Sequence, residues 1–132
     1  MNKNFDDKTK LIETYEDKGL NKGTVIDVLA GFIINNDFVR ILESFLKEDV
    51  ERANYSGVVY SDEFDIDDDE YFGENKVLFY YGVGEIREDI VTHKELCEYL
   101  EVASEFYISN HPEKTNEVDF FISEIKEKYN VN

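Results

Sequence analysis

The sequence predicts an α+β fold: a small, mainly antiparallel sheet of about three strands packed with about four helices, in the order α-α-β-β-β-α-α. Apolar residues recur at helical spacing toward both ends of the chain. The middle instead has short apolar runs next to glycines, which are typical of strands. With 132 residues, the chain is long enough for one ordinary domain and too short for two, so we expect a single domain over residues 1–132.

Residues 1–22 are polar and weakly patterned, which predicts a partly ordered segment with one short helix face, at Leu11, Ile12 and Tyr15. The next apolar residues repeat every three or four positions and predict an amphipathic helix; they are Val25, Ile26, Val28, Leu29, Phe32 and Ile33. The pair Asn35-Asn36 interrupts this pattern. Asp37 can cap a second helix by accepting a hydrogen bond from an amide of the first turn. A single bent helix over residues 24–48 is the alternative.

The middle of the chain predicts extended structure. Residues 57–60 form a short apolar run, and residues 76–81, KVLFYY, form a longer one. Such a continuous run is typical of a strand covered on both faces. Residues 82–84, Gly-Val-Gly, predict a turn into a partner strand. That strand has a rough alternation, set by Ile86, Glu88 and Ile90.

Two helices are predicted after the strands. Residues 92–95, THKE, are a capping box, in which the threonine hydroxyl and the glutamate carboxylate accept hydrogen bonds from each other's amides. The helix that follows should end near His111, because Pro112 disfavours helical geometry in the residue before it. Thr115 or Asn116 then caps the last helix.

The segment between the first two predicted strands, SDEFDIDDDEYFGEN at residues 61–75, holds eight carboxylates and no basic residue. Such a run repels itself unless a cation or a cationic partner offsets the charge. The aromatic residues beside it argue against a solvated tail, since disordered acidic segments are poor in aromatics. We therefore expect a partner-binding surface, made of Tyr60, Asp62, Glu63, Asp65, Asp67, Asp68, Asp69, Glu70, Tyr71 and Phe72. For the three aromatic members a place in the core is an equal alternative.

The charge of the whole chain restricts its partners. With 31 acidic and 14 basic residues, the formal net charge is −17. Nucleic acids and anionic membranes would be repelled at long range, so basic proteins are the favoured partners. No apolar run is long enough to span a membrane, the N-terminus lacks the apolar core of a secretory signal, and Cys97, the only cysteine, cannot form an intrachain disulfide. These features together predict a cytoplasmic protein.

The acidic segment does not fit a calcium loop. Asp65, Asp67 and Asp69 fall at positions 1, 3 and 5 of an EF-hand. However, Glu70 stands where the sharp turn needs glycine, and Lys76 stands where a bidentate glutamate should bind. We expect no specific metal site.

Catalytic groups are not evident either. His93 and His111 both fall at predicted helix ends, where a solvated histidine is ordinary. Cys97 lies in a first helical turn, which can activate a thiol, but Leu96 and Leu100 flank it and favour a packed core thiol. The sequence therefore predicts a binding protein with no cofactor, not an enzyme.

The segment FDIDDDEYFGENKVLFYYG (residues 64–82), with the helix THKELCEYLEVASEFYISNHPE (residues 92–113), resembles immunity proteins of contact-dependent growth inhibition systems. More narrowly, it is similar to those that act against ribonuclease toxins. The resemblance implies a cytoplasmic, non-catalytic protein that binds the basic C-terminal domain of a cognate toxin and keeps it from RNA. The alternative is an acidic nucleic-acid mimic, which would spread its carboxylates along the molecule instead of concentrating them in one segment.

Overall fold

The computed structural model describes residues 3–35 and 37–131. Within them, α-helices and β-strands follow in the order α1 (Lys3–Asp17), α2 (Gly23–Asn35), α3 (Phe38–Lys47), β1 (Ser56–Tyr60), β2 (Lys76–Tyr81), β3 (Arg87–Thr92), α4 (His93–Asn110) and α5 (Thr115–Lys128). The α+β class and the three-stranded antiparallel sheet are confirmed, with α1 as one helix more than expected. No helix among the described residues is both long and apolar enough to cross a membrane.

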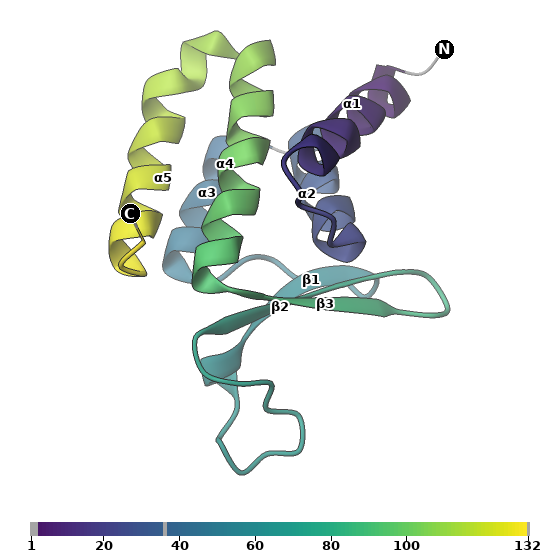
Figure 1. Cartoon of the computed structure of the whole chain (residues 1–132), viewed down its shortest axis with the longest axis vertical. Helices are drawn as coiled ribbons and strands as arrows, with labels where there is room; N and C mark the ends of the chain where they lie inside the picture. The colour runs from purple at the N-terminus through teal and green to yellow at the C-terminus, as the bar shows by residue number, and fades with distance from the viewer. Residues whose placement is uncertain (1–2, 36, 132) are drawn as a thin grey trace.

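The sheet is an antiparallel meander in the order β1-β2-β3, and the α-helices described here, α1 to α5, lie on one of its faces (Figure 1). Val77 and Phe79 of β2 point to the helices and are completely buried. Phe79 pairs with Val58 of β1 and stacks on Phe45 of α3, with ring centroids 6.2 Å apart. The core therefore lies between the sheet and the helices.

The opposite face of the sheet is open, so the prediction that β2 is covered on both faces is wrong. Leu78 pairs with Val59 of β1 on one side and with Ile90 of β3 on the other, which places the three side chains in one row across this face. Val59 and Leu78 are half-buried, and Ile90 is 37% exposed. The run KVLFYY is continuous because its outward residues are apolar even though no helix covers them. We call these three residues the apolar row.

Helix α1 occupies most of the segment that was expected to be only partly ordered. Leu11 and Tyr15 are buried in the core, and the Tyr15 hydroxyl donates a 2.8 Å hydrogen bond to the carbonyl of Tyr99 in α4. The two tyrosine rings lie 5.3 Å apart. The short predicted helix face is therefore part of a longer helix that packs on α2 and α4.

The break between α2 and α3 excludes a single bent helix. Helix α2 ends at Asn35 and α3 begins at Phe38. As predicted, the Asp37 carboxylate caps α3 by accepting a 3.1 Å hydrogen bond from the Val39 amide. Asn36, the second residue of the predicted interruption, lies outside the described residues.

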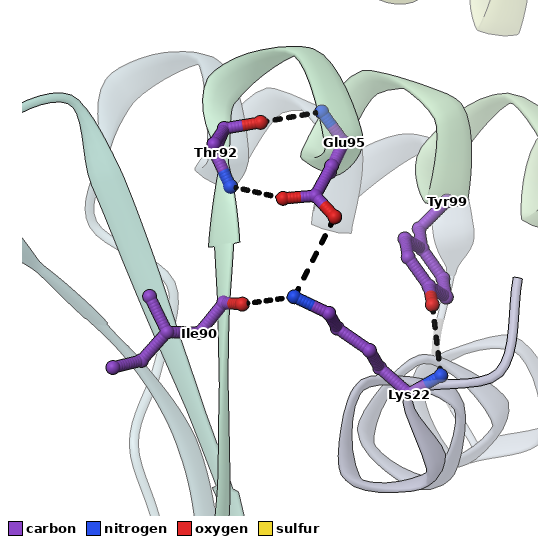
Figure 2. A network of polar contacts seen from close by, with 5 residues as sticks. All are labelled: Lys22, Ile90, Thr92, Glu95 and Tyr99. Carbon is purple, nitrogen blue, oxygen red and sulfur yellow. Dashed lines mark hydrogen bonds and ion pairs between the residues drawn. The ribbon is translucent and has the colours of Figure 1, made fainter.

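The predicted capping box fixes the start of α4 (Figure 2). The Thr92 amide donates to Glu95 Oε1 over 2.9 Å, and the Glu95 amide donates to Thr92 Oγ1 over 3.1 Å. The Thr92 amide is the main cause that lowers the pKa of Glu95. Lys22 joins the start of α2 to this corner: its ammonium pairs with Glu95 at 3.5 Å and donates to the Ile90 carbonyl, while its amide donates to the Tyr99 hydroxyl.

Helix α4 ends where Pro112 was expected to end it, with His111 as its C-terminal cap. The prediction for the next cap is wrong, because neither Thr115 nor Asn116 caps α5. A 3-10 turn over Pro112–Lys114 leads directly into the helix, which already includes Thr115. The Thr115 hydroxyl instead donates a 2.7 Å hydrogen bond to the Pro112 carbonyl.

Candidate functional site

Residues 61–75, which we call the acidic loop, connect β1 to β2 and project from the sheet on the side away from the helices (Figure 1). The base of the loop is fixed to the sheet. Glu63 Oε2 accepts a 2.7 Å hydrogen bond from the Tyr60 amide and pairs with Arg52. The Lys76 amide donates to Ser61 Oγ over 3.2 Å. Glu63, which the sequence placed among the partner-binding residues, is exposed and already has an ion pair and a backbone hydrogen bond within the protein.

The acidic loop has internal order as well. The Asp65 amide donates a 2.9 Å hydrogen bond to Asp68 Oδ2, and the Asp68 amide donates to the Asp65 carbonyl, also over 2.9 Å. The Tyr71 amide donates to the Asp68 carbonyl over 3.1 Å. Phe64 and Phe72 meet edge to face, with ring centroids 6.1 Å apart. These contacts hold the carboxylates in a folded turn instead of a free coil.

Most carboxylates of the loop have no cationic partner. In the described part of the chain, Glu63 is the only acid of the loop with an ion pair. The following loop acids are exposed: Asp62, Asp65, Asp67, Asp68, Asp69, Glu70 and Glu74. Over residues 3–35 and 37–131, no group of three or more His, Cys, Asp or Glu side chains is arranged to hold a metal ion. The loop thus presents uncompensated negative charge to solvent.

The three aromatic candidates differ in their burial. Tyr60 is 3% exposed and belongs to the core, whereas Tyr71 and Phe72 are half-buried at the loop. Tyr71 and Phe72 therefore keep surface that a partner could cover. Tyr60 pairs with Val77 in the sheet, so its side chain lies on the helix side together with that core residue.

Two adjoining pockets lie at the base of the loop, with volumes of about 690 Å³ and about 380 Å³. Both are lined by Glu74, Asn75 and His93. The larger continues over the start of α4 to the residues that follow α5, and the smaller continues under the acidic loop. The two pockets together form one indented region at this end of the sheet.

A polar cluster at these pockets comes from three helix ends that are far apart in the sequence. The Tyr129 hydroxyl, after α5, donates a 2.6 Å hydrogen bond to Glu48 Oε2, after α3. The His93 ring, at the start of α4, stacks on Tyr129 with centroids 3.8 Å apart. Glu48 itself has a left-handed backbone conformation, with φ of 57°. His93 is therefore a half-buried, packed residue, and the expectation that it is solvated is wrong.

Burial governs the ionisation of this cluster. It raises the pKa of the Tyr129 and Tyr60 phenols, so both stay protonated. It lowers the pKa of His93, although the carboxylates of Glu48 and Asp62 partly oppose this effect. Sequence reasoning missed the cluster because no local pattern joins its members. Their only common signal is a polar or aromatic side chain at a helix end.

The remaining candidates for chemistry are ordinary structural residues. Cys97 is 2% exposed, and burial raises the pKa of its thiol to about 11, which confirms the packed core thiol. His111 is exposed, stacks on Tyr107 with centroids 4.3 Å apart, and lies within 3.2 Å of the Tyr107 carbonyl through Nδ1.

Comparison with known proteins identifies the family. The family model described as CDI immunity protein, where CDI denotes contact-dependent growth inhibition, matches residues 22–122. This span runs from the start of α2 through the sheet and the acidic loop into α5. No curated protein and no solved structure gives a significant match. Because the matched span covers most of the chain, the protein belongs to the CDI immunity proteins.

Proposed function

We propose that this protein binds the cognate toxin domain of its CDI system and neutralises it, and that this toxin domain is a basic ribonuclease. Membership of the immunity family supports the neutralising role. The observation that carries the choice of a basic partner is the acidic loop, whose exposed carboxylates lack cationic partners among the described residues, apart from Glu63. Binding alone accounts for this function, with no catalysis by the immunity protein.

The charge of the loop fits the requirements of a ribonuclease site. Such a site attracts a polyanion through basic residues, so an acidic surface can compete for the same place. Electrostatic steering by clustered charges raises association rates by about 10–10³-fold. Each exposed ion pair adds only ~0–1 kcal/mol to stability, so the loop acids serve encounter and orientation more than affinity.

Affinity in this proposal comes from apolar surface on the same side of the sheet. The apolar row of Val59, Leu78 and Ile90 lies on the open face, from which the acidic loop also projects (Figure 1). Tyr71 and Phe72 add half-buried aromatic surface at the loop itself. An apolar centre beside a charged rim is the usual composition of a specific protein interface.

The compartment follows from the same proposal. A toxin that cleaves RNA acts in the cytoplasm, so we place the complex there. The partner is the C-terminal toxin domain encoded next to this gene, and neither nucleic acid nor membrane takes part in binding.

The proposal is tested by co-expression with the C-terminal domain of the toxin encoded directly upstream. We expect the two proteins to co-purify, cells to survive toxin expression, and cellular RNA to stay intact. A basic ribonuclease from an unrelated source serves as the specificity control and should not be inhibited. Failure to bind the neighbouring toxin, or equal inhibition of the unrelated ribonuclease, would contradict a cognate immunity function.

A further inference from the structure

The smaller pocket, of about 380 Å³, has features that steering by the acidic loop does not explain. We call it the loop-base pocket. Carboxylates from two separate elements line it, namely Glu48 after α3 and Asp62, Asp65 and Glu74 of the loop. Lys76 is the only basic residue among the lining residues, apart from the titratable ring of His93. The pocket therefore concentrates negative charge in a concave space instead of on an open surface.

The Tyr60 side chain adds an unsatisfied polar atom at this pocket. Tyr60 lines the pocket and is 3% exposed, and its hydroxyl has no hydrogen-bond partner among the described residues. Buried hydroxyls nearly always have a partner, so the free Tyr60 oxygen at this pocket is available to accept a hydrogen bond from a bound group. Glu48 is the charged residue that acts most strongly on this phenol. Tyr60 and Glu48 both line this pocket, so the free hydroxyl and a carboxylate face the same space.

Three rings that line the pocket suit a flat cation. Phe64 and Tyr71 of the loop contribute aromatic surface. His93 contributes the third ring, which is held in place by stacking on Tyr129. Because burial lowers the pKa of His93, the ring is neutral at neutral pH and does not offset the carboxylates.

We propose that the loop-base pocket binds one arginine side chain of the partner protein, an assignment that rests on the proposed toxin-binding function. A guanidinium presents five N–H donors in a plane, which matches carboxylate acceptors on one edge and aromatic rings on its faces. Glu48 and Asp62 would accept charge-assisted hydrogen bonds, and the Tyr60 oxygen would accept another. Lysine offers a compact, strongly hydrated charge without a stacking face, so arginine fits better.

The pocket can be tested without the toxin. Nuclear magnetic resonance would follow the backbone amides of Ser61, Asn75 and His93 during titration with N-acetyl-arginine amide. We expect saturable shifts confined to these pocket residues, and none from the neutral analogue N-acetyl-citrulline amide. Absence of saturation up to about 0.1 M probe, where binding free energy becomes negligible, would overturn the assignment. Equal shifts from the citrulline analogue would overturn it as well.

Variants then locate the binding groups. Glu48→Gln keeps the shape and the acceptor for Tyr129, and Tyr60→Phe removes one oxygen atom. Each should weaken the arginine probe by about tenfold, as expected for a lost hydrogen bond to a charged group. Glu98→Gln, at an exposed position in α4, changes the same charge and should leave the probe affinity unchanged. If Glu98→Gln weakens the probe as much as Glu48→Gln, general charge and not the pocket explains binding.

The toxin complex gives an independent readout. With the toxin domain bound, Glu48→Gln and Tyr60→Phe should speed dissociation by about tenfold and leave the association rate within about twofold. If the unchanged protein does not bind the toxin, the proposed function fails, while the probe titration still decides the chemistry of the pocket. If the toxin binds but neither variant changes its dissociation rate, the pocket does not bind an arginine side chain of the toxin.

Discussion

The Tyr129 hydroxyl donates a 2.6 Å hydrogen bond to Glu48 Oε2 and thereby joins the end of α5 to the end of α3. The bond is strong because its acceptor is a carboxylate. It also fixes the ring on which His93 stacks. The wall of the pockets at the base of the acidic loop therefore depends on a contact between residues 81 positions apart.

Replacing Tyr129 by Phe should lower the free energy of unfolding by about 1–3 kcal/mol, because the bond to the Glu48 carboxylate is lost. Urea denaturation measures the change. Tyr55→Phe is the control, since Tyr55 is 57% exposed and its replacement should have little effect. Equal stability of Tyr129→Phe and the unchanged protein would show that the bond contributes nothing in solution.

The stability of the protein should depend on pH through His93. Burial lowers the folded-state pKa of this ring below the ordinary value of 6.5, against the opposing carboxylates of Glu48 and Asp62 and with help from the Lys128 charge. Between the two pKa values the unfolded chain binds more protons, so the contribution of His93 is complete above about pH 6.5 and is lost as pH falls through the folded pKa.

The measurement compares urea midpoints of the unchanged protein and His93→Gln at pH 7.5 and pH 5.5. The unchanged protein should lose more stability on acidification than His93→Gln does. Comparing the two proteins cancels the titration of the acids, because both proteins contain the same acids. His111→Gln, at an exposed position, should follow the unchanged protein. A parallel loss in all three proteins would contradict the effect of burial on His93.

Neutralising loop acids should slow toxin association without unfolding the protein. The variant Asp67→Asn, Asp69→Asn, Glu70→Gln spares Asp68, which accepts the Asp65 amide. Its association rate should fall, and the difference should shrink as salt rises, because screening shortens to about 8 Å near physiological ionic strength. Its stability should be equal or slightly higher, since self-repulsion is relieved. Surface plasmon resonance at several salt concentrations gives the rates.

A charge-matched control is available on α1. Glu13, Glu16 and Asp17 are exposed residues of α1, a helix on the opposite side of the sheet from the acidic loop (Figure 1). Their replacement by Gln, Gln and Asn changes the net charge by the same amount. If both triple variants slow association equally, net charge is responsible and the acidic loop has no special role.

Neighbouring residues of β2 should behave in opposite ways. Phe79 is completely buried, and Phe79→Ala should cost about 3–5 kcal/mol of stability. Leu78 lies on the open face, and Leu78→Ser should cost much less stability and instead speed dissociation from the toxin. Urea denaturation and dissociation rates separate the two effects. A toxin dissociation rate that does not change in Leu78→Ser would remove the apolar row from the interface.

Local patterns were enough to predict much of the fold. The run KVLFYY gave the limits of β2, and the Thr92–Glu95 box gave the start of α4, because each depends on neighbouring residues. The cap of α5 failed, since the turn after Pro112 satisfies the Thr115 hydroxyl through a backbone carbonyl. The open face of the sheet was missed because apolar composition does not reveal which face a helix covers.

The candidate site was predictable only in part. The acidic loop could be found in the sequence because its charge density lies in one segment. The cluster of Glu48, His93 and Tyr129 could not be found, because tertiary packing alone brings three helix ends together. Likewise, nothing local distinguishes a buried Tyr60 from an exposed one.

The left-handed backbone at Glu48 lowers the stability of the folded protein at a position that carries a carboxylate. A non-glycine residue in that conformation costs about 1–2 kcal/mol, and glycine would avoid the strain. A glycine there would also remove the carboxylate that receives Tyr129 and lines the loop-base pocket. If the loop-base pocket binds as we propose, the strain at Glu48 is what keeping a carboxylate at this helix end costs, because glycine would be the less strained residue there.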